Sequence, residues 1–262
     1  MTKAAITALE AEVARAAELF ASLTAEEWAA PSGCAGWRVQ DVAQHMASTF
    51  HSIAEPATIE SGGEHDVEQN AEVPVQARRE WAPAQVMAEY AEWSARGVVS
   101  LAALQEPPLS DAVIPLGNLG QHPMHILGNA IAFDHYCHLR HDIGAAIPRA
   151  AALTRDVTVL AATVEWMMTG VPQMCTDALA GCHQGVNLEF GDIEQTWSLA
   201  PGPEGGRWTV TAGATPGLPT AATTAHDFVS WGTKRADWRG LGVAGIVHAG
   251  AAADTLDAIN VI

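Results

Sequence analysis

Three side chains of this chain could hold a metal ion together: His45, Asp134 and His138. Asp134 and His138 are four residues apart, so on a helix they lie on one face within reach of a single ion. His45 belongs to an earlier segment with a helical pattern and supplies a third ligand. A catalytic metal site commonly takes three protein ligands and leaves one position for water or substrate. We therefore predict a divalent metal site formed by these three residues.

The proposed ligands lie on the apolar face of a predicted helix. That face carries, at spacings of three and four, Met124, Leu127, Ile131, Asp134 and His138. Burying a carboxylate and two imidazoles is costly unless they are paired or bound to a metal. Metal coordination would compensate all three side chains. The alternative is that Asp134 only forms a hydrogen bond with His138 or His135 on the helix surface.

Other polar side chains compete for the same role. His135, His138 and His141 share a second face of the predicted helix at a spacing of three. If the helix is rotated from our prediction, His135 or His141 could replace Asp134 as the ligand. Cys137 lies off the proposed face, so we expect it to be a small buried thiol.

Apolar residues that recur every three to four positions predict the helices that must place these ligands. The pattern covers residues 3–22, 39–53, 83–104 and 123–138. Thr24 and Glu27 predict a capping box before Trp28. Residues 54–79 are polar and acidic, which indicates a long connection. Four such helices form an up-and-down bundle, whose facing helices commonly hold metal sites.

The pattern changes in the second half of the chain. Residues 144–152 resemble a linker, and a helix is expected from 155 to 168. Strand-forming residues with turn signals between them then predict an antiparallel sheet, followed by helices; the strands are 186–190, 196–199 and 208–211, and the helices are 226–231 and 251–259. We predict the fold class α + (α+β), with a four-helix bundle over residues 1–148 and a small α+β domain over 149–262.

Composition limits the classes of partner. The 262 residues are 48% hydrophobic and 16% charged, as in a globular protein. A formal net charge of −17 would repel a phosphate backbone, so we expect no nucleic-acid partner. The first residues do not resemble a secretory signal, and the apolar run Val157–Val164 is too short to cross a bilayer. We expect a cytoplasmic monomer or homodimer with no membrane partner, and with its four cysteines reduced.

One longer stretch resembles a known family. Trp28 and the run from Pro31 to His45, which reads PSGCAGWRVQDVAQH, resemble the signature of the mycothiol-dependent maleylpyruvate isomerase family. Its second half appears as Asp134-x-x-x-His138, running on into residues 141–143. Residues 224–228 and 232–235 are similar to the smaller second domain of that family, which resembles sterol-carrier folds. The resemblance implies that the bundle is DinB-like.

The resemblance also implies chemistry. It implies a zinc-binding enzyme with mycothiol or a similar low-molecular-weight thiol as cosubstrate, and with the metal held by His45, Asp134 and His138. The family has glutamate where this chain has Asp134, and the shorter side chain would alter the reach of the carboxylate or require the helix to come closer. Zinc lowers the pKa of a bound thiol, so that the nucleophilic thiolate is available at neutral pH.

Several reactions are open to such a thiolate. Addition to a conjugated double bond, rotation and elimination would isomerise a small electrophile, whereas addition alone or displacement would be S-transfer. Arg235 and Arg239 are candidates for binding a substrate carboxylate through a two-pronged contact. The same ligand set could instead activate water in a metal-dependent hydrolase, could hold iron or another divalent metal, or could belong to a non-enzymatic metal-binding or sequestering protein.

Overall fold

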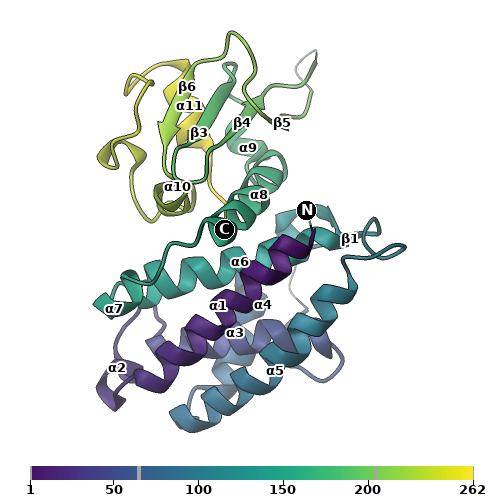
Figure 1. Ribbon diagram of the computed structural model, residues 1–262, viewed down its shortest axis with the longest axis vertical. Coiled ribbons are helices and arrows are strands. Elements are labelled where there is room, and N and C mark those ends of the chain that lie inside the picture. The colour runs from purple at the N-terminus through teal and green to yellow at the C-terminus, as the bar shows by residue number, and fades with distance from the viewer. Residues whose placement is uncertain (1, 64–65, 204–205, 262) are drawn as a thin grey trace. The chain divides into compact units, whose positions relative to one another are not determined.

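The computed structural model describes residues 2–63, 66–203 and 206–261. The chain divides into two compact units, Met1–Thr154 and Arg155–Ile262 (Figure 1). Each unit folds around its own apolar core. Within the described residues, no helix combines the length and the apolar character that crossing a membrane requires.

The predicted four-helix bundle is confirmed in the first unit. Its helices are α1 (Thr2–Ser22), α3 (Val39–Ala54), α5 (Pro83–Ala103) and α6 (Leu127–Cys137). Helix α3 packs against α5, and α1 packs against both α5 and α6. The apolar stripes that predicted these helices face inward, and their largest fully buried side chains include Leu9, Phe20, Met46, Phe50 and Tyr90.

A glycine sets the approach of α3 to α5. A Cβ atom added at Gly97 would lie 2.4 Å from Cδ1 of Phe50, closer than real Cβ contacts come. The two helices can pack this closely because Gly97 has no side chain. The contact fixes the position of α3, the helix that carries His45, relative to α5.

The connection predicted between the second and third helices is partly wrong, because it contains helix α4 (Val67–Arg78). Asp66 caps this helix by accepting hydrogen bonds from the backbone N–H groups of residues 68 and 69. The sequence does not indicate this helix, because it contains Pro74 and few apolar residues. Its stability comes from tertiary packing, since Val75 and Arg78 are buried.

Short elements complete the bundle. The capping box at Thr24 and Glu27 is present at the start of α2 (Ala25–Ala29), and Trp28 is buried. A hairpin of β1 (Val113–Pro115) and β2 (Gln121–Pro123) with the turn η1 (Gly117–Leu119) lies between α5 and α6 in the chain. The turn η2 (Met124–Ile126) leads into α6, and α7 (Pro148–Ala151) is a single turn in the predicted linker.

Helix α6 continues as a π-helix, η3 (His138–Ile143). A π-helix is rare and is found frequently at functional sites. Arg140 fastens it to α1, because its Nη1 and Nη2 donate to the carboxylate of Glu12 at 2.7 and 3.0 Å. Neither side chain is exposed to solvent. This buried ion pair holds the segment that begins with His138.

The second unit has the predicted α+β composition. Its elements are α8 (Val157–Met174), α9 (Thr176–Leu179), β3 (Val186–Phe190), β4 (Gln195–Ala200), β5 (Thr209–Ala212), β6 (Thr220–Thr223), α10 (Ala225–Gly232), η5 (Trp238–Gly240) and α11 (Ala251–Ala258). The sheet order is β5-β4-β3-β6. The sheet is mixed rather than wholly antiparallel, because β6 pairs parallel to β3. This short strand carries no alternating pattern, so the sequence did not reveal it.

Candidate metal centre

The three predicted ligands meet in the first unit. His45 extends from α3, Asp134 from α6, and His138 from the start of η3. His45 Nε2 lies 3.2 Å from Asp134 Oδ1, and His138 Nε2 lies 3.4 Å from the same oxygen. The ligand atoms of all three residues lie within 4.8 Å of one another. The structure thus brings together Asp134 and His138, which are four residues apart, with His45, which lies 89 positions before Asp134.

This spacing suits a small divalent ion. In a tetrahedral zinc site with bonds of about 2.0–2.1 Å, neighbouring ligand atoms are about 3.3–3.4 Å apart. The separations of 3.2 and 3.4 Å from Asp134 Oδ1 are close to that value. Asp134 Oδ2 is buried and lies 3.4 Å from His135 Nδ1. Two imidazoles and one carboxylate also form a donor set of known catalytic zinc sites. The residues present therefore fit a divalent metal.

The proposed ligands are not sealed from solvent. The exposed fractions of the His45, Asp134 and His138 side chains are 16%, 18% and 13%. A small ligand can therefore reach them, whereas the backbone around them is packed in the bundle. This combination of partial access and rigid support is expected of a site that binds a substrate.

The charged forms of Asp134 and His138 stabilise each other. Burial raises the pKa of Asp134. The charge of His138 and hydrogen bonds from His135, His138 and His45 lower the pKa by a larger amount, so it lies well below the ordinary value. Burial lowers the pKa of His138, but the Asp134 charge, together with hydrogen bonds, raises it well above the ordinary value. The site therefore favours a carboxylate next to a positive charge, which a proton or a metal cation can supply.

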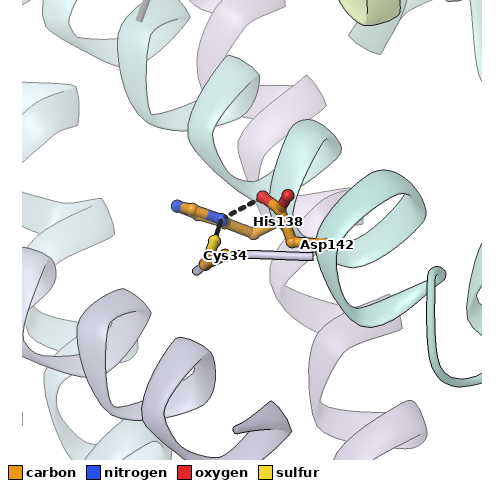
Figure 2. Close-up of side chains that lie close together, drawn as sticks. All are labelled: Cys34, His138 and Asp142. Carbon is orange, nitrogen blue, oxygen red and sulfur yellow. Dashed lines mark hydrogen bonds and ion pairs between the residues drawn. The ribbon is translucent and has the colours of Figure 1, made fainter. Parts of the chain in front are cut away.

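A second carboxylate orients His138 (Figure 2). His138 Nδ1 donates to Asp142 Oδ2 at 2.8 Å, and Asp142 is buried in η3. Metal-binding histidines typically donate their other ring nitrogen to a carboxylate in this way. The hydrogen bond leaves Nε2 facing Asp134. This role of Asp142 was not predicted from the sequence, although its spacing of four residues from His138 is a signal for it.

Cys34 also lies beside His138. Its Sγ atom is 4.0 Å from His138 Nδ1, and Cys34, His138 and Asp142 form a second group of potential metal ligands (Figure 2). Ligation through Nδ1 would require loss of the proton that Nδ1 donates to Asp142. The observed hydrogen bond and this second site therefore exclude each other. Gly33 N donates to the Asp142 carbonyl at 2.8 Å and holds the loop of Cys34 against η3.

The competing histidines have other partners. His135 is fully buried, and its Nδ1 donates to the Ile131 carbonyl at 3.0 Å, with Asp134 Oδ2 farther away at 3.4 Å. Its Nε2 accepts from the Tyr90 hydroxyl at 3.1 Å. His141 lies with its ring centroid 6.4 Å from that of Tyr136. Among the residues that the structure describes, neither group of potential ligands contains His135 or His141. Cys137 is buried, and the four cysteines form no disulfide.

The two candidate arginines belong to the second unit. Arg239 Nη1 and Nη2 donate to the two oxygens of Asp257, each at 2.7 Å, and its Nε donates to the His248 carbonyl. Its pKa is raised, chiefly by the hydrogen bonds that it donates to Asp257. Arg235 follows α10, and its backbone N–H donates to the Ser230 carbonyl at 2.9 Å. The fork of Arg239 is therefore already paired with a carboxylate of its own unit.

Comparison with known proteins identifies a family and a fold. The family model of the mycothiol maleylpyruvate isomerase N-terminal domain matches residues 9–139. A crystal structure of the mycothiol-dependent maleylpyruvate isomerase is similar with a TM-score of 0.53 and 13% identity, covering 94% of this chain and 95% of that chain. A mutant of that enzyme gives the same TM-score and coverage at 12% identity. At such identities the likeness shows a common fold. A comparison with the curated proteins gives no match.

Proposed function

The chain belongs to the family of the mycothiol maleylpyruvate isomerase N-terminal domain, and on this premise we propose that it is a zinc-dependent enzyme that uses mycothiol or a similar thiol on a small electrophile. The observation that carries the proposal is the convergence of His45 Nε2, Asp134 Oδ1 and His138 Nε2. Three protein ligands leave a position open for a cosubstrate.

The protein residues have separate tasks in this proposal. His45, Asp134 and His138 would hold the metal, and Asp142 keeps His138 in the tautomer with a free Nε2. When bound, zinc would lower the pKa of a coordinated thiol, so that the thiolate is available at neutral pH. The bundle supplies a rigid site, which reduces the entropy cost of placing thiol and electrophile together.

The reaction we favour is reversible addition to a conjugated double bond. The thiolate sulfur forms a bond to the β-carbon, and the π-electron pair moves onto the conjugated carbonyl group as an enolate. Rotation about the new single bond follows. The enolate then re-forms the double bond and expels the thiolate, so isomerisation consumes no thiol. If a proton is captured at carbon instead, the product keeps the sulfur and the reaction is S-transfer.

A substrate with a carboxylate would need a cationic partner. We propose Arg235 and Arg239 for this contact, since the planar guanidinium binds a carboxylate through two hydrogen bonds. Arg239 would have to exchange its bond with Asp257 for one with the substrate. Arg235→Lys and Arg239→Lys test the two separately, because loss of a two-pronged contact raises KM for the acid.

The test of the proposed function is an assay of the zinc-loaded protein with a panel of conjugated unsaturated acids, with and without mycothiol. We expect turnover that depends on the thiol and is lost in His45→Ala. Ser52→Ala is the matched control, because Ser52 is an exposed residue on the same helix. Unchanged thiol concentration identifies isomerisation, and stoichiometric consumption identifies transfer. Turnover in water without any thiol would overturn the proposal in favour of a hydrolase.

A further inference from the structure

The two histidines of the proposed centre are oriented in different ways. His138 has a carboxylate on its far nitrogen, whereas His45 Nδ1 is buried without a hydrogen-bond partner. A histidine that binds metal through Nε2 usually relies on a hydrogen bond at Nδ1 to fix its ring. On the Nδ1 side, therefore, packing rather than a hydrogen bond restrains the His45 ring.

The packing partner is an indole. The ring centroid of Trp37 lies 5.4 Å from that of His45, with the planes at 49°. On another side, the ring of His138 meets His45 edge-on at 4.9 Å and 80°. These two rings restrict the rotation of the His45 ring. Contact with Trp37 thus restrains the His45 ring, which has no hydrogen bond at Nδ1.

Trp37 is itself held by a carboxylate on α4. Its Nε1 donates to Glu72 Oε2 at 2.7 Å, and the other oxygen of Glu72 accepts from the side chain of Gln76. The Trp37 carbonyl accepts from Ser32 N at 2.9 Å, and Trp37 N donates to the Cys34 carbonyl at 3.0 Å. Both the indole and the backbone at this position are therefore fixed.

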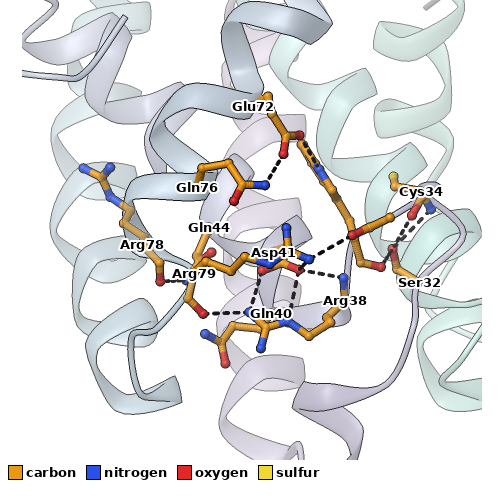
Figure 3. Close-up of polar contacts among 12 residues, drawn as sticks. Ser32, Cys34, Arg38, Gln40, Asp41, Gln44, Glu72, Gln76, Arg78 and Arg79 are labelled. Atoms are coloured by element: carbon orange, nitrogen blue, oxygen red, sulfur yellow. Dashed lines mark hydrogen bonds and ion pairs between the residues drawn. The ribbon is translucent and has the colours of Figure 1, made fainter.

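Hydrogen bonds hold the C-terminal end of helix α4 against α3 (Figure 3). Gln44 Nε2 donates to the Arg78 carbonyl at 2.6 Å. Arg38 Nη2 donates to the Arg79 carbonyl at 2.7 Å and also to the fully buried Asp41 at 2.8 Å. A carboxylate on such a helix has little freedom to move relative to the helix that carries His45.

We propose that Glu72 is a positioning residue of the metal centre: its hydrogen bond to Trp37 holds the indole against His45 and fixes the orientation of that imidazole. The inference rests on the proposed function only in taking His45 as a ligand. Glu72 does not touch the metal or the substrate; it acts through Trp37.

The test compares Glu72→Ala with Glu72→Gln and with the control Glu68→Ala, an exposed residue of the same helix. Zinc affinity is measured by competition with a chelator. We expect Glu72→Ala to weaken zinc binding about 10- to 100-fold, the range for residues that orient a ligand. Glu72→Gln keeps an acceptor oxygen for Trp37 Nε1, so it should restore most of the affinity. Glu68→Ala should match the wild type.

A second readout needs no metal. The ring protons of His45 in the metal-free protein lie beside the indole, so their NMR shifts report the Trp37 contact directly. We expect these signals to move and broaden in Glu72→Ala and to stay in place in Glu68→Ala. Unchanged zinc affinity together with unchanged His45 signals would overturn the inference. If the wild type binds no metal, the proposed function fails, and the NMR comparison alone decides the role of Glu72.

Discussion

The carboxylate of Asp142 lies 2.8 Å from Nδ1 of His138, on the side of the ring away from Asp134. This single hydrogen bond decides which nitrogen of His138 is available to a metal. It also depends on the π-helix η3, which carries both residues. The proposed centre is therefore built from three ligands and from the residues that fix their orientation.

Removing the charge of Asp142 should weaken the centre without dismantling it. In Asp142→Asn we expect zinc affinity to fall about 10- to 100-fold, because the neutral amide holds the His138 tautomer less firmly. Chelator competition measures the change. Asp111→Asn, an exposed change in the same unit, is the control. Wild-type affinity in Asp142→Asn would show that His138 does not need this orientation.

Cys34 decides between the two groups of potential ligands. If the metal lies between His45, Asp134 and His138, Cys34→Ser should retain the full metal content while His45→Ala loses it. If it lies between Cys34, His138 and Asp142, the two variants should behave in the opposite way. Elemental analysis of the purified variants distinguishes the two cases. If both variants retain the full metal content, neither group of residues holds the metal.

The buried ion pair behind η3 should be important for folding. Glu12→Gln leaves the guanidinium of Arg140 without its charge partner in a fully buried position. We expect a loss of about 3–5 kcal/mol in the free energy of unfolding, as for other broken buried pairs. Chemical denaturation checks this value. The exposed Glu10→Gln on the same helix should change it by less than about 0.5 kcal/mol. Equal stabilities would refute the anchoring role.

Glu27 should make the bundle sensitive to acid. A hydrogen bond from Arg149 is the main cause that lowers the pKa of Glu27 from 4.5 to about 2. A carboxylate with a lower pKa in the folded state binds fewer protons there than in the unfolded state. Its contribution to stability is therefore full above pH 4.5 and is lost as the pH falls toward 2. Glu27→Gln should remove this part of the pH dependence in denaturation experiments. Because the pair is exposed, salt should weaken it.

The sequence predicted the bundle well because its helices are amphipathic. Stripes such as Val39, Val42, Met46 and Phe50 need only one buried face, and that face is visible in the spacing. Helix α4 was not predicted because it contains few apolar residues and shows no apolar stripe. Its stability depends on Asp66 as a cap and on contacts of Arg78 with distant carboxylates. Such tertiary contacts leave no periodic signal.

The candidate site was predictable only in part. The ligand set followed from two polar residues on an apolar stripe and from one histidine on a facing helix. The positions of Cys34 and Glu72 did not follow, because they depend on how the loop of Gly33 meets η3 and on a helix hidden in a polar segment. Asp142 had the right spacing, but the π-helical turn that carries it has no signature in the sequence.

The metal content of the purified protein tests the central claim most directly. We expect about one zinc or other divalent ion per chain in the wild type and in Ser52→Ala, and a large loss in His45→Ala and Asp134→Asn, with unchanged helical content in all four. Asp134→Asn is the most informative of these variants, because this position differs from the glutamate of the family that the chain resembles. A wild-type protein that holds no divalent metal after purification and reloading, or ligand variants that hold as much as the wild type, would contradict the metal centre.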